Sequence, residues 1–240
     1  MSERDDAPHD FSRAVLQPVS GYQAVAGFLR REMALGRIRP GDRLPPERRL
    51  SEQLGVSRET LRQALRILEG SGQIVISRGA SGGAIVQDAA LDPRLIREEV
   101  RMRAVEIGEL TEFRAIVESG GAALAAVRRS DDDLEAMAQA QRDLASADTK
   151  SGSRIADTAF HIALAEASGN SFVRDAVEDA RVRMFEPVDL MSFDFVKETS
   201  WHAHEQILEA VRQGDAVAAD AAMRAHLRTT HEEFTAVVET

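Results

Sequence analysis

Apolar residues recur every three or four positions in three short stretches near the start of the chain, as they do on the buried face of a helix. The first stretch, Gly21 to Leu35, therefore predicts a helix. A second helix is expected after the Pro45-Pro46 pair, because proline suits a first helical turn, and Gly55 ends it. Ser57 is a good N-cap for a third. The expected buried positions are Tyr22, Val25, Ala26, Leu29, Met33, Leu50, Leu54, Leu61, Ala64, Leu65 and Leu68.

The segment that follows the third helix changes to a strand pattern. Residues 74–86, IVISRGASGGAIV, alternate around a glycine-rich tip, which is typical of a two-stranded hairpin. Two short helices joined by a tight turn and followed by a hairpin form a winged helix-turn-helix.

The third helix carries residues suited to DNA. Arg58, Arg62 and Arg66 share a face separate from the apolar stripe, and arginine bonds guanine edges or phosphates. Ser57 and Thr60 lie at the helix start, the part of a recognition helix that reaches DNA. On the wing, Arg78 stands beside Gly79, which lets the backbone approach a groove closely. The alternative is that these arginines only solvate an exposed face.

Beyond the hairpin the pattern is helical throughout. Ala, Leu, Glu and Arg dominate, and no strand-like alternation occurs. The expected helices span residues 93–104, 107–128, 131–147, 153–168, 171–186, 196–212 and 215–238. We therefore predict a mainly α protein with a disordered tail (1–19), a winged helix-turn-helix domain (20–88), a linker (89–94) and an antiparallel bundle of six to seven helices (95–240).

Charge is divided between these parts. The chain has a net charge of −10, yet residues 20–88 carry 11 Lys or Arg against 7 Asp or Glu. A basic head and an acidic body are expected where only the head contacts phosphate. Cysteine is absent, which fits a reducing cytosol. No apolar run reaches the length of a membrane span, so we expect a cytoplasmic protein without a membrane partner.

Three histidines and an aspartate fall on apolar stripes of the predicted bundle. Asp157 and His161 are four residues apart and so share one helix face, which Phe160 and Leu164 direct inward. His204 and His226 occupy comparable positions on two other helices. Facing helices of bundles build metal sites in this way, and the set suits zinc, nickel or another first-row divalent ion such as manganese. The alternative is that each histidine is a satisfied core residue.

Arg114 also falls within an apolar stripe, with Ile107, Leu110 and Val117. Its charge must be compensated if it is buried. Glu118, one turn on, could form a structural ion pair with it. Alternatively, Arg114 binds the carboxylate of a small molecule that also contacts the metal.

These residues carry a family resemblance. LPPERRLSEQLGVSRETLRQALRILEGSG with its wing resembles the head of the GntR superfamily of bacterial transcription regulators. FRAIVE, Asp157-x-x-x-His161 before ASGN, HEQILEAVRQGD and Met223-x-x-His226-Leu227 resemble the FCD ligand-binding domain of its FadR branch, in its seven-helix version.

The resemblance implies a homodimer on a palindromic operator. It carries DNA contacts to Arg48, Ser57, Arg58, Thr60, Arg62, Arg78 and Gly79. It also implies a metal held by Asp157, His161, His204 and His226, and a small organic acid as effector near Arg114. The function expected is thus a metabolite-responsive transcription factor, in particular a repressor, and not an enzyme. Two alternatives remain: a metal-dependent hydrolase, and a regulator whose bundle serves only for dimerisation.

Overall fold

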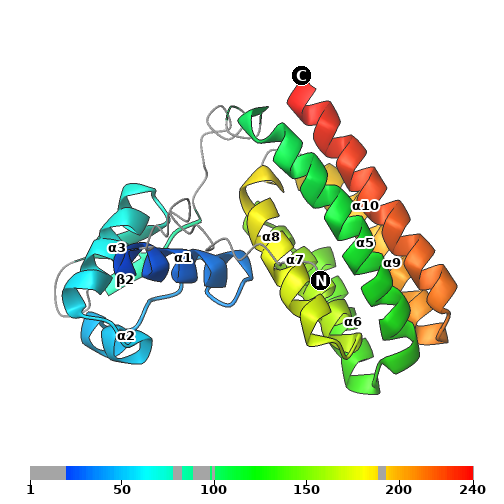
Figure 1. Ribbon diagram of the computed structural model, residues 1–240, viewed down its shortest axis with the longest axis horizontal. Helices are drawn as coiled ribbons and strands as arrows, with labels where there is room; N and C mark the ends of the chain where they lie inside the picture. The colour runs from blue at the N-terminus through cyan, green and yellow to red at the C-terminus, as the bar shows by residue number, and fades with distance from the viewer. Residues whose placement is uncertain (1–19, 78–82, 89–97, 99–100, 189–192, 240) are drawn as a thin grey trace, which may run out of the picture.

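The computed structural model describes residues 20–77, 83–88, 98, 101–188 and 193–239, without the side chains of 185–188, 193–196, 234 and 237–239. It confirms the predicted fold class, a winged helix-turn-helix head followed by a helical bundle (Figure 1). Tail residues 1–19, linker residues 89–94 and the wing tip 78–82 lie outside the described residues.

The head contains the three predicted helices, α1 (Gly21–Ala34), α2 (Glu47–Leu54) and α3 (Arg58–Gly70). Gly55 ends α2 with φ 65°, a left-handed conformation that favours glycine. The stripe residues Leu29, Leu61 and Leu68 are almost completely buried and form one core with Ile74 and Val86 of the wing. The helix-turn-helix is therefore packed on its wing.

The wing consists of β1 (Ile74–Ser77) and β2 (Gly83–Val86), paired antiparallel with Ile74 opposite Val86. A short segment before α2 adds to it: Arg43 bridges Ile85, and Leu44 N donates to Ala84 O over 2.9 Å. The sequence analysis did not predict this contact, because residues 41–44 show no alternation. It anchors the connection between α1 and α2 to the wing.

Six helices follow among the described residues of the second domain: α5 (Ala104–Arg128), α6 (Asp131–Ser146), α7 (Lys150–Ala167), α8 (Ser171–Val188), α9 (Phe193–Gln213) and α10 (Ala216–Glu239). Helix α7 begins at residue 150 instead of 153, because Thr149 caps it and accepts from Gly152 N over 3.1 Å. The helix expected over 93–104 falls mostly outside the described residues, although Arg101 and Met102 are helical.

The bundle has its own core, separate from that of the head. Helix α10 packs along α5 (Figure 1), and α6 packs along α7. Phe160, Ile207 and Met223 have no exposed surface in this core. Within the described part of the chain, no helix is long and apolar enough to cross a membrane.

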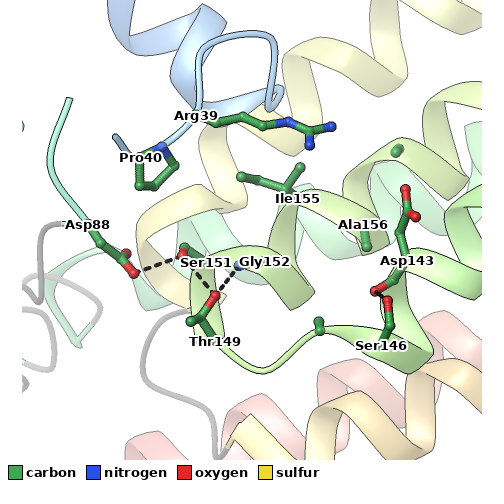
Figure 2. A pocket seen from close by; sticks show the side chains of 12 residues that line it. Arg39, Pro40, Asp88, Asp143, Ser146, Thr149, Ser151, Gly152, Ile155 and Ala156 are labelled. Atoms are coloured by element: carbon green, nitrogen blue, oxygen red, sulfur yellow. Dashed lines mark hydrogen bonds between the residues drawn. The ribbon is translucent and has the colours of Figure 1, made fainter. Parts of the chain in front are cut away.

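Head and bundle meet where the turn after α1 reaches α7. Gly36 has φ 69°, and a Cβ there would lie 2.6 Å from Ile155 Cγ2, so this close approach requires glycine. Beside it lies a cavity of about 440 Å³ (Figure 2) with Arg39 and Pro40 on the head side. Ser151 donates to Asp88 Oδ2 over 2.9 Å across this junction. The two domains are therefore in direct contact.

Candidate metal centre and nucleic-acid interface

The first turn of α3 is fixed by a hydrogen-bonded cap and lies at the protein surface. Ser57 caps the helix and accepts from Thr60 N over 3.0 Å, and the two hydroxyls lie 2.8 Å apart. Both side chains therefore help to fix the first turn while lying at the surface. The Ser57 cap was predicted from the sequence, and its geometry is confirmed.

The arginines of the helix-turn-helix differ in how firmly they are held. Arg58 and Arg66 are exposed. Arg62 is only half-exposed, because its Nε lies 3.2 Å from Glu47 Oε2. Arg48 is 76% exposed and pairs with Glu52 over 3.1 Å. The predicted outward face of α3 thus exists, but Arg62 is partly turned toward α2.

The other two predicted DNA-contacting residues, Arg78 and Gly79, belong to the wing tip and lie outside the described residues. Their place relative to α3 remains a prediction. The part of the interface that the structure describes is accordingly formed by α2 and α3.

The structure brings Asp157, His161, His204 and His226 together at the centre of the bundle. Helix α7 supplies the first two, α9 supplies His204 and α10 supplies His226. One ligand atom from each residue can be chosen so that all four lie within 4.8 Å of one another. The histidines are buried, with exposed fractions of 1%, 0% and 6%. The prediction that these four side chains converge from three helices is confirmed.

The donor atoms of this cluster face each other. His161 Nε2 and His226 Nε2 are 3.3 Å apart, and His204 Nε2 lies 3.5 Å from Asp157 Oδ1. The Phe160 ring stacks on that of His204 with centroids 4.0 Å apart, which holds the imidazole in place. Neither ring nitrogen of His204 has a hydrogen-bond partner within the described part of the chain. A buried polar atom without a partner calls for one.

A second layer of side chains orients the ligands. Glu118 Oε2 lies 2.5 Å from His161 Nδ1, and its Oε1 accepts from Arg114 Nε over 2.6 Å. An ionised carboxylate can only accept, so His161 donates from Nδ1, and its Nε2 faces the cluster. Carboxylates that orient ligating histidines in this way are common around metals.

Arg181 of α8 is a member of the site that the sequence analysis missed. Its guanidinium forms an ion pair with Asp157 Oδ2 and donates to Thr158 Oγ1 over 2.9 Å. Arg181 is only 6% exposed. Its position among the buried residues Val177, Ala180 and Met184 could have identified it by the same stripe argument that identified Arg114.

Burial and the charges of the site keep its acids ionised and lower the pKa of two of its imidazoles. Burial by itself disfavours ionisation of Asp157, but Arg181 and the three histidines hold the pKa of Asp157 well below its ordinary value. Glu118 is likewise buried, yet Arg114 and His161 keep its pKa far below normal. Burial, reinforced by His161, lowers the pKa of His226 to about 3. Burial also lowers the pKa of His204 well below its usual range.

This donor set fits a divalent metal ion. Three imidazoles and one carboxylate, pointing at a common centre, are ligands that zinc and its first-row neighbours accept. The two nitrogens of His204 have no hydrogen-bond partner among the described residues, whereas His161 Nε2 and His226 Nε2 lie within hydrogen-bond distance of each other. The alternative in which every histidine is a satisfied core residue does not hold for His204.

The comparisons with known proteins agree with this division into a head and a bundle. Residues 21–83 match the bacterial regulatory proteins of the gntR family, and residues 109–229 match the FCD domain. The chain is 31% identical to the HTH-type transcriptional regulator LutR of Bacillus subtilis, over 85% of this chain and 96% of that protein. It is 32% identical to the Uxu operon transcriptional regulator of Escherichia coli, over 89% of this chain and 86% of the relative.

Among solved structures, Escherichia coli McbR/YncC superposes with a TM-score of 0.55 at 19% identity, covering 91% of this chain and 98% of that one. At this identity the likeness concerns the fold alone. It supports the order of a winged head followed by a helical domain.

Proposed function

Because this chain belongs to the gntR family of bacterial regulatory proteins and carries an FCD domain, we propose that it is a metabolite-responsive repressor. It is a DNA-binding transcriptional regulator, and its relatives are regulators rather than enzymes. In our proposal it acts in the cytoplasm as a homodimer on a palindromic operator. A small organic acid, bound beside a divalent metal in the bundle, controls its affinity for DNA.

The exposed face of α3 supports the DNA-binding step. A recognition helix contacts base edges with its N-terminal residues, and Arg58 lies there, exposed, directly after the Ser57 cap. Arg66, two turns on, extends the basic face. A dimer would present two such helices to two half-sites, which accounts for a palindromic operator.

The His204 geometry is the observation that carries the metal proposal. Asp157, His161, His204 and His226 would hold the ion, and the bound ion would supply a Lewis-acid centre for an oxygen ligand. Zinc is the expected metal, with nickel and manganese as alternatives. The residues of the chain hold the donors in place: Phe160 by stacking, Glu118 and Arg181 by hydrogen bonds.

Charge balance supports an anionic effector. The positive charges of Arg114 and Arg181 already balance the negative charges of Glu118 and Asp157. A divalent ion would therefore place two uncompensated positive charges in a buried site. Buried charge is costly unless it is paired, so an organic acid with one or two carboxylates is the fitting ligand.

The structure is compatible with both roles that the sequence left open for Arg114. It forms the expected ion pair with Glu118, so the structural role is present. Only its Nε appears in that contact, and the guanidinium carries further N–H donors. We propose that these donors bind the effector carboxylate.

The test uses purified full-length protein and the DNA upstream of its own and neighbouring genes. Binding to a palindrome there should weaken steeply as salt increases, because phosphate contacts release counterions.

Zinc-loaded protein should be stabilised by particular organic acids in a thermal-shift screen, and the same acids should release the DNA. Full operator binding by both Arg58→Ala and Arg62→Ala proteins would refute the assignment of α3. Failure to retain stoichiometric metal would favour a bundle that serves only for dimerisation.

A further inference from the structure

Helix α8 contacts both the metal cluster and the head. Arg181, which faces the cluster, and Glu178, which faces the head, are three residues apart and so lie on neighbouring positions of one helix surface. Figure 1 shows α8 on the side of the bundle that faces α1, and the two helices are in contact. One helix therefore connects the two functional sites.

At the head side, Glu178 is held by two arginines. Its Oε2 accepts from Arg31 Nη2 over 2.8 Å, and its Oε1 pairs with Arg37. Arg31 also pairs with Asp179. We call this group, Arg31, Arg37, Glu178 and Asp179, the clasp. Glu178 is 7% exposed, so the contact is shielded more than an ordinary surface ion pair.

At the cluster side, Asp157 divides its two oxygens between two functions. Oδ2 pairs with Arg181, while Oδ1 lies toward His204 at 3.5 Å. A cation bound at Oδ1 would draw negative charge away from Oδ2 and weaken the attraction to Arg181. The Nε of Arg181 has no hydrogen-bond partner among the described residues. Arg181 is thus not saturated. Glu178 precedes it by three residues on α8, the spacing at which an acid and an arginine on one helix can pair.

We propose that α8 transmits the state of the metal cluster to the head through competition for Glu178. A metal ion on Asp157 releases Arg181, and Arg181 then attracts the Glu178 carboxylate away from Arg31 and Arg37. Metal binding consequently loosens the clasp and frees the head. This inference rests on the metal site of the proposed function and adds the route by which that site controls the head.

Other charged residues of α8 with described partners do not make this connection. Arg174 pairs with Asp175 on the same helix, and Arg183 pairs with Glu106 of α5. Neither pair joins the cluster to the head. Asp175 therefore provides a matched control for Glu178, since both are acids of α8 with arginine partners.

Hydrogen exchange on the full-length protein measures the clasp directly. Backbone amides of residues 31–42 should exchange about two- to fivefold faster with Zn²⁺ than with chelator, the range expected for loss of a partly exposed ion pair. In Glu178→Gln these amides should exchange fast in both conditions, while zinc still binds, with an affinity measured by calorimetry that changes no more than about two- to fivefold, since the coupling is reciprocal. Asp175→Asn should behave as wild type. Arg181→Gln should exchange slowly whether or not zinc is present, and Arg181→Lys should restore part of the response.

The outcomes separate this inference from the proposed function. Zinc binding with unchanged or slower exchange at residues 31–42 would overturn the inference and leave the metal site standing. A zinc response that persists in full in Glu178→Gln would overturn it as well. Failure of the wild-type protein to bind zinc, nickel or manganese would overturn both the metal site of the proposed function and this inference.

Discussion

The head and the bundle use arginine in opposite ways. On α2 and α3 the arginines are exposed or half-exposed, and the partners of Arg48 and Arg62 are acids that are themselves in solvent. In the bundle, Arg114 and Arg181 are almost completely buried, and each pairs with a carboxylate that contacts a histidine of the cluster. An exposed pair is weak and can be exchanged for a phosphate. A buried pair instead fixes the geometry of its neighbours.

Exposed and buried arginine ion pairs should differ most in how much stability is lost when the arginine is removed. Arg114→Met leaves Glu118 buried without its main counter-charge, and we expect the bundle to lose about 3 to 5 kcal/mol of unfolding free energy. Arg142→Met, which breaks an exposed pair with Glu135, should cost no more than about 1 kcal/mol. Urea denaturation of the metal-free proteins measures both. Similar losses of unfolding free energy in the two variants would show that the buried and the exposed ion pairs do not differ in their contribution to stability.

Metal binding should distinguish the inward histidines from an outward one. At a zinc concentration about 100-fold above Kd, the wild-type bundle should gain about 2.7 kcal/mol of stability. His204→Ala should lose this gain, whereas His202→Ala should keep it, because His202 is exposed. Thermal denaturation with zinc and with chelator provides the comparison. Equal responses of the two variants would exclude His204 as a ligand.

The exposed arginines should matter for DNA and little for stability. Arg58→Ala should weaken operator binding by about 1 to 3 kcal/mol and leave the unfolding free energy of the head nearly unchanged. Arg142→Ala, an exposed arginine of the bundle, is the control and should bind as wild type. Titration of labelled operator at fixed salt measures the effect. A loss of stability in place of a loss of affinity would show that Arg58 is a structural residue.

The smallest effect concerns pH. Because the pKa of His226 falls to about 3 and that of His204 is also lowered, both stay neutral in the folded, metal-free protein. The unfolded chain takes up protons below about pH 6.5, so stability should be full above that pH and fall as pH decreases toward the folded values. The slope should approach about 1.4 kcal/mol per pH unit for each histidine.

The pH range from 6.5 down to 5 separates the histidines from Asp157 and Glu118, since the lowered pKa values of these two acids affect stability only below the ordinary range of acids. His226→Gln should reduce the slope by about half. Denaturation at half-unit steps in the presence of chelator gives the measurement, and an unchanged slope in the variant would contradict the assignment.

Local patterns were sufficient for much of this structure. Ser57 and Gly55 set the limits of helices α2 and α3 through their own backbone chemistry, and His161, His204 and His226 could be assigned inward because apolar neighbours define a stripe. Arg181 was accessible to the same reasoning. The His161–Glu118 contact was not, because it joins residues on α5 and α7 that only the packing of the bundle brings together.

The ion pairs between the two domains could not be predicted from the local sequence either. Arg31 lies on α1 and Arg37 in the turn after it, and the acid partner that the nearby sequence offers Arg37 is Glu32, at 3.2 Å, not Glu178. Glu178 is 141 residues or more away from both. Such a pair depends on how two separately formed domains come to lie against each other.

This separation along the chain has a consequence for how the clasp works. Head and bundle belong to one polypeptide, so the two arginines meet Glu178 as an intramolecular event, at the high effective concentration that a covalent tether provides. An ion pair too weak to hold two separate molecules together can then keep the head in place for most of the time. The same weakness makes the contact easy to reverse, so that a change in the partner of one buried carboxylate is enough to shift the balance.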